Sequence, residues 1–258
     1  MEYTFLALLL ASGLFAGMLL FLEFGHRLGR RFERIDSGGA HSGTGSVEGA
    51  VFALLGLLVA FTFSGAAARF DARRHLIVEE ANDIGTAYLR LDVLPAEAQP
   101  ALHELFRRYL DSRLAVYRKL PDVAAARAEL ARSSTLQGEI WSQAVAGCRA
   151  AGPQPCAILL LPALNAMIDI TTTRTMTMLI HPPGVVFGLL FGLGLGCSVL
   201  AGYSMAHGTL RKWPHMIVFA AITALTVYVI LDLEYPRLGL IRLDAFDQVL
   251  VELRQSMN

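Results

Sequence analysis

The sequence has few charged residues for its length. Only 17% of its 258 residues are Asp, Glu, Lys or Arg, whereas a soluble domain carries about a quarter. Acidic and basic residues balance at 22 each, so the net charge gives no sign of a nucleic-acid partner. With 54% hydrophobic residues and a mean hydropathy of +0.49, the composition indicates a membrane protein.

The sequence also lacks the motifs of common enzymes and of metal sites. HExxH, GxSxG, CxxC and the Walker pattern are absent, and the seven histidines are scattered. The Gly- and Ser-rich segment 37–46 lacks the Gly-Lys-Ser/Thr ending of a phosphate loop and predicts a flexible turn. The acidic residues Glu79, Glu80 and Asp83 are typical of a solvated or salt-bridged helix face. We therefore expect no enzyme, no cofactor and no metal site.

Four apolar runs are long enough to cross a bilayer, which takes about 20 helical residues. They cover residues 3–24, 48–68, 185–205 and 216–233. The first run lacks the basic start and the cleavage site of a signal peptide, so we expect a retained anchor.

The residues between the second and third runs have helical patterns without membrane-level hydrophobicity. We expect helices over 70–92, 100–120, 123–149 and 157–180, with a break near Ser133–Thr135. The sequence thus predicts an all-α membrane protein with four transmembrane helices and a helical extramembranous domain inserted between helices 2 and 3. The expected divisions are 1–68, 69–183 and 184–235, followed by an amphipathic tail, 236–258.

Two cysteines flank a turn rich in Gly and Pro. Cys148 and Cys156 are either free thiols or a disulfide, and a disulfide requires an oxidising compartment. The first apolar run has no Lys or Arg before it and four Arg directly after it. The positive-inside rule therefore places both termini and residues 69–183 outside the cytoplasm.

The second apolar run has two different helical faces. One face carries an acid and two arginines at the ends of an apolar stripe, in the order Glu48, Phe52, Leu55, Val59, Thr62, Ala66, Arg69 and Arg73. The neighbouring face carries small residues that permit close helix contact, namely Gly49, Ala53, Gly56, Ala60, Ser64 and Ala67. Either packing or a pore lining fits the first stripe, and the choice of stripe stays open.

The third apolar run has a glycine at every fourth position. Gly184, Gly188, Gly192 and Gly196 form a smooth strip, which predicts close packing against another helix.

Three segments resemble the bestrophin-like family of bacterial membrane proteins. They are EGAVFALLGLLVAFTFSGAAARFDARRHLIVEEANDIGTAYLRLDVLP at 48–95, LHELFRRYLDSRL at 102–114 and LDLEYPRLGLIRLDAFDQVL at 231–250. The segment LLGLLVAFTFSGAAARFDARR is also similar to the second membrane helix of true bestrophins. Those proteins are pentameric ion channels with an apolar neck and a cytoplasmic soluble domain. This chain departs from them in retaining only Phe70 of the aromatic-rich motif after that helix.

The resemblance implies an oligomeric ion channel with the second helix lining the pore. Neck candidates are Phe52, Leu55, Val59 and Thr62, and the pore mouths are assigned to Glu48, Arg69 and Arg73. The expected partners are the lipid bilayer, small inorganic ions and further copies of the chain, with a pentamer implied by the resemblance alone. The alternative is a non-conducting membrane module whose external domain binds a periplasmic partner or ligand.

Overall fold

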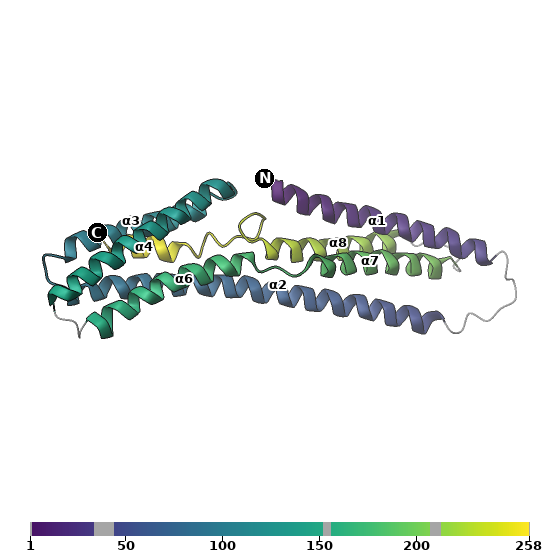
Figure 1. Cartoon of the computed structure of the whole chain (residues 1–258). Helices are drawn as coiled ribbons and strands as arrows, with labels where there is room; N and C mark the ends of the chain where they lie inside the picture. Colours follow the sequence, from purple (N-terminus) through teal and green to yellow (C-terminus); the bar gives the residue numbers. More distant parts are fainter. Residues whose placement is uncertain (1, 34–43, 152–155, 207–212, 258) are drawn as a thin grey trace. The chain divides into compact units, whose positions relative to one another are not determined.

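The computed structural model describes residues 2–33, 44–151, 156–206 and 213–257. Arg34 and residues 37–43 of the expected Gly/Ser turn lie outside these ranges. All regular secondary structure in the described residues is helical (Figure 1). The expected all-α class is therefore confirmed for this part of the chain.

The elements follow one another along the chain as a series of helices and short connections. They are α1 (Glu2–Glu33), α2 (Thr44–Leu89), the 3₁₀ turn η1 (Arg90–Val93), α3 (Gln99–Arg118), α4 (Val123–Ala151), the π-helical η2 (Cys156–Leu160), α6 (Leu161–Leu179), α7 (Gly184–Met205), α8 (Trp213–Glu234) and α9 (Gln248–Ser256). Within the described residues, four helical segments are long and apolar enough to cross a membrane, judged by length and composition. They are Tyr3–Phe32, Gly45–Val93, Ile158–Met205 and Trp213–Glu234.

The chain forms two compact units. Unit 1 contains Met1–Arg69 and His181–Tyr235, and unit 2 contains Phe70–Ile180 and Pro236–Asn258. The second predicted membrane run continues without a break into the helix that follows it, so α2 contributes its first part to unit 1 and its second part to unit 2.

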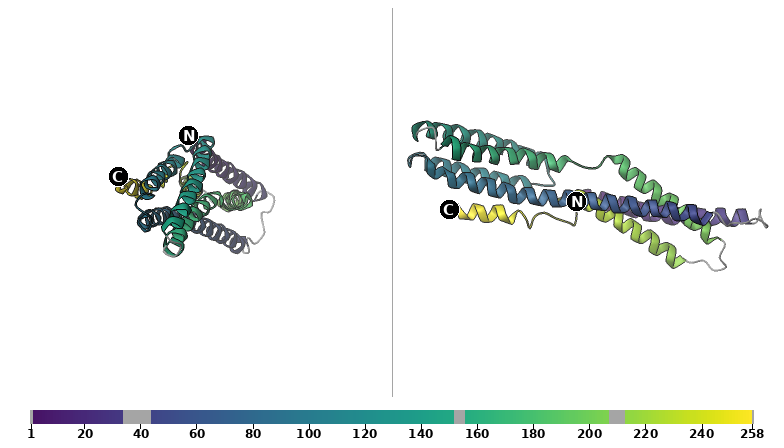
Figure 2. Two further views of the ribbon diagram at one scale, coloured as in Figure 1. Left: turned by 60° about the vertical axis from the view of Figure 1, so that its left-hand side comes forward. Right: turned by 90° about the horizontal axis from the view of Figure 1, so that it is seen from below.

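In unit 1, α1 lies against α7 and α8 (Figures 1 and 2). The closest approach of α1 to α7 depends on glycine. A Cβ atom on Gly202 would overlap the backbone carbonyl of Leu22, and one on Gly25 would overlap the carbonyl of Val199. Because neither residue has a side chain, the two backbones pack directly against each other.

In unit 2, large apolar side chains from α2, α3, α4 and α6 form one core. Fully buried members include Ile84, Phe106, Leu110, Ile140 and Leu164. Proline at the first turn of α3 and of α6 suits the helix start, where the missing N–H has no helical partner in any case.

Helix α4 runs without the break that the sequence analysis expects at Ser133–Thr135. The Ser133 hydroxyl donates to the Glu129 carbonyl at 3.1 Å and shares a hydrogen bond of 2.9 Å with Ser112 on α3. The expected break was wrong because these polar side chains bond within α4 and to α3, so α4 continues.

Residues 236–258 belong to unit 2, although their sequence predicts a separate amphipathic tail. Leu243, Leu250 and Met257 are buried in the core of that unit, and α9 lies against α3. The amphipathic pattern of this segment therefore reflects packing against the helices of unit 2.

Candidate pore helix and its surroundings

The four neck candidates lie on the face of α2 that is turned toward other helices of unit 1. Phe52 packs edge-on against Phe219 of α8, with ring centroids 5.9 Å apart. Phe52, Leu55 and Val59 line a shallow cavity of about 270 Å³ together with α8. Thr62 donates to the Leu58 carbonyl at 2.8 Å within its own helix. In a single chain this face is largely covered.

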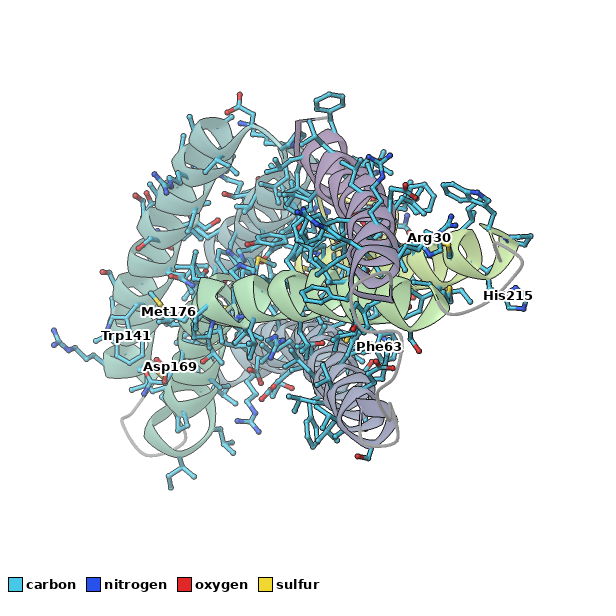
Figure 3. The ribbon with its side chains drawn as sticks, turned by 90° about the vertical axis from the view of Figure 1, so that its right-hand side faces the viewer. Arg30, Phe63, Trp141, Asp169, Met176 and His215 are labelled. Atoms are coloured by element: carbon cyan, nitrogen blue, oxygen red, sulfur yellow. A yellow bond between two sulfur atoms is a disulfide. The ribbon has the colours of Figure 1, made fainter. Side chains whose placement is uncertain are left out.

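The neighbouring face of α2 is exposed. It carries the small residues Gly49, Ala53, Gly56, Ala60 and Ser64, of which Gly56 also borders the cavity shared with α8. Leu57 and Phe61 stand beside them and are 52% and 67% exposed. Phe63, labelled in Figure 3, is an exposed aromatic residue on the same helix. We name the face that carries Ala53, Leu57, Ala60, Phe61 and Ser64 the outer face of α2.

Arg69, at the end of the apolar part of α2, is bound by a buried carboxylate. Its Nε atom lies 2.9 and 3.1 Å from the two carboxylate oxygens of Glu234, whose side chain is fully buried. The Nδ1 atom of His181 lies 3.5 Å from the same carboxylate, and the imidazole stacks on Tyr235 with centroids 4.4 Å apart. Arg69, His181 and Tyr235 are the residues at which the chain passes between the two units.

The other two expected mouth charges, Glu48 and Arg73, precede and follow Arg69 along α2. Arg73 belongs to unit 2, is 3% exposed and donates from Nη2 to the Ile180 carbonyl at 3.1 Å. Glu48 lies 21 residues before Arg69, which corresponds to about 30 Å along a helix. Glu234 was missed as the partner of Arg69, although its place just after the last apolar run marks it as a charge near a membrane end.

The glycine strip of α7 faces open space within unit 1. A Cβ atom on Gly184, Gly188, Gly192 or Gly196 would meet nothing within 4 Å. The α7 glycine whose added Cβ atom would overlap the α1 backbone is instead Gly202. The helices of this chain therefore leave the strip uncovered, and its predicted close packing stays a prediction about a helix from another copy.

Cys148 and Cys156 form a disulfide that joins the end of α4 to the start of η2. Their Cα atoms are 5.5 Å apart, and both side chains are buried in unit 2. Cys197 is a free, buried cysteine in α7.

Unit 2 contains a buried charge network centred on Glu80. This carboxylate pairs with Arg113 of α3 and Arg174 of α6, and all three side chains are at most 1% exposed. Burial alone would raise the pKa of Glu80, but the charges and hydrogen bonds of the two arginines outweigh it and hold the pKa below its ordinary value. Glu79, next in sequence, is exposed. Of the two, Glu80 alone has the salt-bridged character that the sequence allowed.

Comparison with protein families matches a model described as the bestrophin-like domain over residues 8–245. This match covers most of the chain and includes all of α2 and most of each unit. The chain belongs to the bestrophin-like family.

A solved structure supports the bestrophin-like fold. The chain is similar to the crystal structure of a bacterial bestrophin homologue from Klebsiella pneumoniae that carries a tyrosine-to-alanine mutation. The TM-score is 0.61 at 15% sequence identity, and the match covers 92% of this chain and 98% of that one. At this identity the likeness concerns the fold. A comparison with curated proteins finds no match.

Proposed function

We propose that this bestrophin-like chain forms a homo-oligomeric ion channel whose pore is lined by α2. The observation that carries the proposal is the bare outer face of α2, an uncharged face on a helix long enough to span the bilayer. The uncovered glycine strip of α7 offers a second smooth surface for contact with another copy of the chain. Unit 1 would lie in the membrane and unit 2 outside it.

The outer face of α2 is our first candidate for the pore lining. Leu57 and Phe61 are the large apolar side chains on it, one helical turn apart, and together they provide a constriction that gates by dewetting. Phe52, Leu55, Val59 and Thr62 are the second candidate. The cavity beside them leaves part of that face open, so a rearrangement on assembly could expose it.

Ion flux into liposomes tests the proposal and separates the two faces. Leu57→Ser on the outer face should raise basal flux, because a hydroxyl keeps an apolar constriction wet. Val59→Ser is the matched variant on the covered face, and we expect its flux to equal that of the wild type. The reverse result would assign the pore to the four sequence-predicted residues. Unchanged flux in both variants would contradict a pore along α2.

Oligomeric state decides between the channel and the alternative module. An intact assembly of several copies in detergent, with protein-dependent flux of chloride or potassium, would support the channel. A monomer or simple dimer without flux would favour a non-conducting module that binds a partner through unit 2.

The charged residues near the ends of α2 do not all contribute equally to the electrostatic potential at the pore mouths. We propose that Glu48 contributes to the mouths more than Arg69 does, because Glu234 neutralises Arg69. Replacing Glu234 with Gln would leave Arg69 charged without its carboxylate. This variant should shift the ratio of anion to cation flux toward anions, and an unchanged ratio would show that Arg69 lies away from the ion path.

We further propose that unit 2 is periplasmic. The charge pattern after the first membrane run supports this orientation, and a disulfide between Cys148 and Cys156 fits an oxidising compartment. A membrane-impermeant maleimide applied to intact spheroplasts that carry the Arg127→Cys variant tests it, because Arg127 is exposed in unit 2. Labelling of this variant, absent from the wild type with its buried cysteines, is the expected result. Labelling only after lysis would place unit 2 in the cytoplasm.

A further inference from the structure

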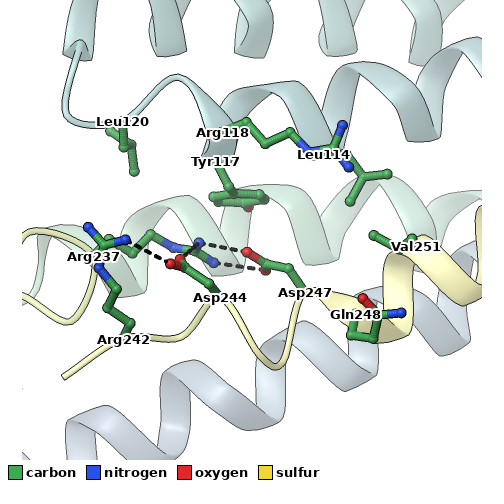
Figure 4. Close-up of a pocket in the computed structure, with 10 residues that line it drawn as sticks. All are labelled: Leu114, Tyr117, Arg118, Leu120, Arg237, Arg242, Asp244, Asp247, Gln248 and Val251. Carbon is green, nitrogen blue, oxygen red and sulfur yellow. Dashed lines mark hydrogen bonds and ion pairs between the residues drawn. The ribbon is translucent and has the colours of Figure 1, made fainter. Parts of the chain in front are cut away.

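Unit 2 contains a cavity between the end of α3 and the segment before and within α9. Its volume is about 360 Å³, within the range of small-molecule sites. Figure 4 shows the lining residues, which come from α3, the turn after it and the C-terminal segment. Leu114, Leu120 and Val251 supply an apolar wall, and charged side chains supply the rest.

Three arginines line this cavity. Arg237 binds Asp247 through two hydrogen bonds of 2.7 and 2.9 Å and lies 3.6 Å from Asp244. Arg242 reaches Asp244 at 3.2 Å in an exposed pair. Arg118 is exposed and makes no ion pair with any part of the chain that the structure describes.

Two further arginines, Arg113 and Arg174, lie against Tyr117 in the cavity wall. The guanidinium of Arg174 lies 4.0 Å from the centre of the Tyr117 ring, and that of Arg237 lies 4.3 Å from it. The Tyr117 hydroxyl accepts a hydrogen bond of 2.8 Å from Arg113. Burial raises the pKa of Tyr117, so this residue stays neutral and adds no negative charge.

The cluster has more positive than negative groups. Five guanidinium groups stand against three carboxylates, which leaves a surplus of two positive charges. The guanidinium groups are those of Arg113, Arg118, Arg174, Arg237 and Arg242, and the carboxylates are those of Glu80, Asp244 and Asp247. Three buried guanidinium nitrogens also find no acceptor among the described residues, namely Nη1 of Arg113, Nε of Arg174 and Nε of Arg237. Buried guanidinium groups are costly unless they are paired, so such a cluster favours an anion.

We propose that this cavity binds a small phosphate monoester. A phosphate monoester carries about 1.5 to 2 negative charges at pH 7, which matches the surplus. Guanidinium groups bind phosphate oxygens through paired hydrogen bonds, and Arg118 and Arg242 at the rim have room to do so. The apolar wall accommodates a short alkyl group on the ester.

Binding to the full-length protein in detergent tests the proposal without any measurement of flux. The probe is n-butyl phosphate, titrated by calorimetry and by thermal unfolding, with sodium chloride at matched ionic strength as the control. We expect saturable binding and a raised unfolding temperature for the phosphate ester alone. The double variant Arg118→Ala/Arg242→Ala should bind at least about tenfold more weakly, since each lost charged hydrogen bond is substantial.

The controls separate this site from general charge effects and from misfolding. Arg127→Ala removes an exposed arginine of α4 outside the cavity and should bind like the wild type. Arg118→Lys/Arg242→Lys keeps the charge, loses the paired geometry and should bind with intermediate strength. Because the replaced side chains are exposed, unliganded unfolding temperatures should match. Phosphatidic acid in the micelles tests whether the phosphate comes from a lipid headgroup or from a soluble ester. A raised unfolding temperature with that lipid alone would still support a phosphate site, with the headgroup as its ligand.

Two results would overturn the proposal. The first is the absence of saturable binding for both phosphate monoesters. The second is equal binding by the wild type and by the Arg118→Ala/Arg242→Ala variant, which would place the ligand elsewhere. Neither result bears on conduction through α2, so the proposed channel function stands or falls separately.

Discussion

The helices within unit 1 and the helices within unit 2 pack together in different ways. In unit 1, α1 and α7 meet backbone to backbone over Gly25 and Gly202. In unit 2, the helices meet through large side chains such as Phe106 and Ile140, around the buried charges of Glu80 and its arginines.

The difference is the one expected if unit 1 lies in lipid and unit 2 in water, as proposed above. Lipid tails are as apolar as leucine, so membrane helices gain little from burying apolar side chains and associate through close backbone packing instead. In water, burying apolar surface is the main driving force, and it can offset the cost of an internal charge network. The packing of unit 1 and of unit 2 thus fits a membrane part and an aqueous part.

The largest expected effect comes from breaking the charge network of unit 2. Glu80→Ala leaves Arg113 and Arg174 buried without their carboxylate, and should lower the free energy of unfolding by about 3–5 kcal/mol. Chemical denaturation of the purified protein measures it. Glu79→Ala is the matched control, because Glu79 is exposed, and should change stability by less than about 0.5 kcal/mol. Equal effects of the two variants would show that the network contributes no stability.

A smaller effect is expected from filling the glycine contact of unit 1. Gly25→Ala places a methyl group against the Val199 carbonyl and forces α1 away from α7, a change that costs about 1–3 kcal/mol. Gly192→Ala is the control within the same unit, since its Cβ atom would meet open space. Thermal unfolding in detergent compares them. If Gly192→Ala dissociates the oligomer without lowering monomer stability, the strip of α7 is an interface between copies.

The smallest expected effect is a pH dependence of the stability that Glu80 gives to unit 2. The folded-state pKa of Glu80 lies below its ordinary value of 4.5, because Arg113 and Arg174 outweigh the effect of burial. Its contribution to stability is therefore complete above about pH 4.5 and is lost as the pH falls through the folded-state pKa. The stability difference between the wild type and Glu80→Gln should narrow below pH 4.5. A difference that stays constant from pH 7 to about pH 3 would contradict an ionised Glu80.

Much of the fold could be predicted from local pattern. The apolar runs, the helical class and the continuation of α2 beyond residue 68 follow from hydrophobic periodicity and from the absence of helix-breaking residues. The family could also be predicted, because the segments at 48–95 and 231–250 carry its pattern in contiguous stretches.

The site could be predicted only in part. Periodicity divides α2 into faces, and it groups Phe52, Leu55, Val59 and Thr62 correctly on one of them. It does not show which face meets α8, because that depends on where a segment far along the chain returns. The pairing of Arg69 with Glu234 has the same origin, since 165 residues separate the two.

The sequence by itself determined that this is a helical, bestrophin-like chain with apolar runs of membrane length, because hydrophobicity and helix periodicity are properties of neighbouring residues. Only the tertiary structure decided which charges are neutralised, which glycines touch another backbone, and where five arginines gather around three carboxylates. Those properties depend on contacts between distant segments, and their energies come from burial and pairing after the helices have met.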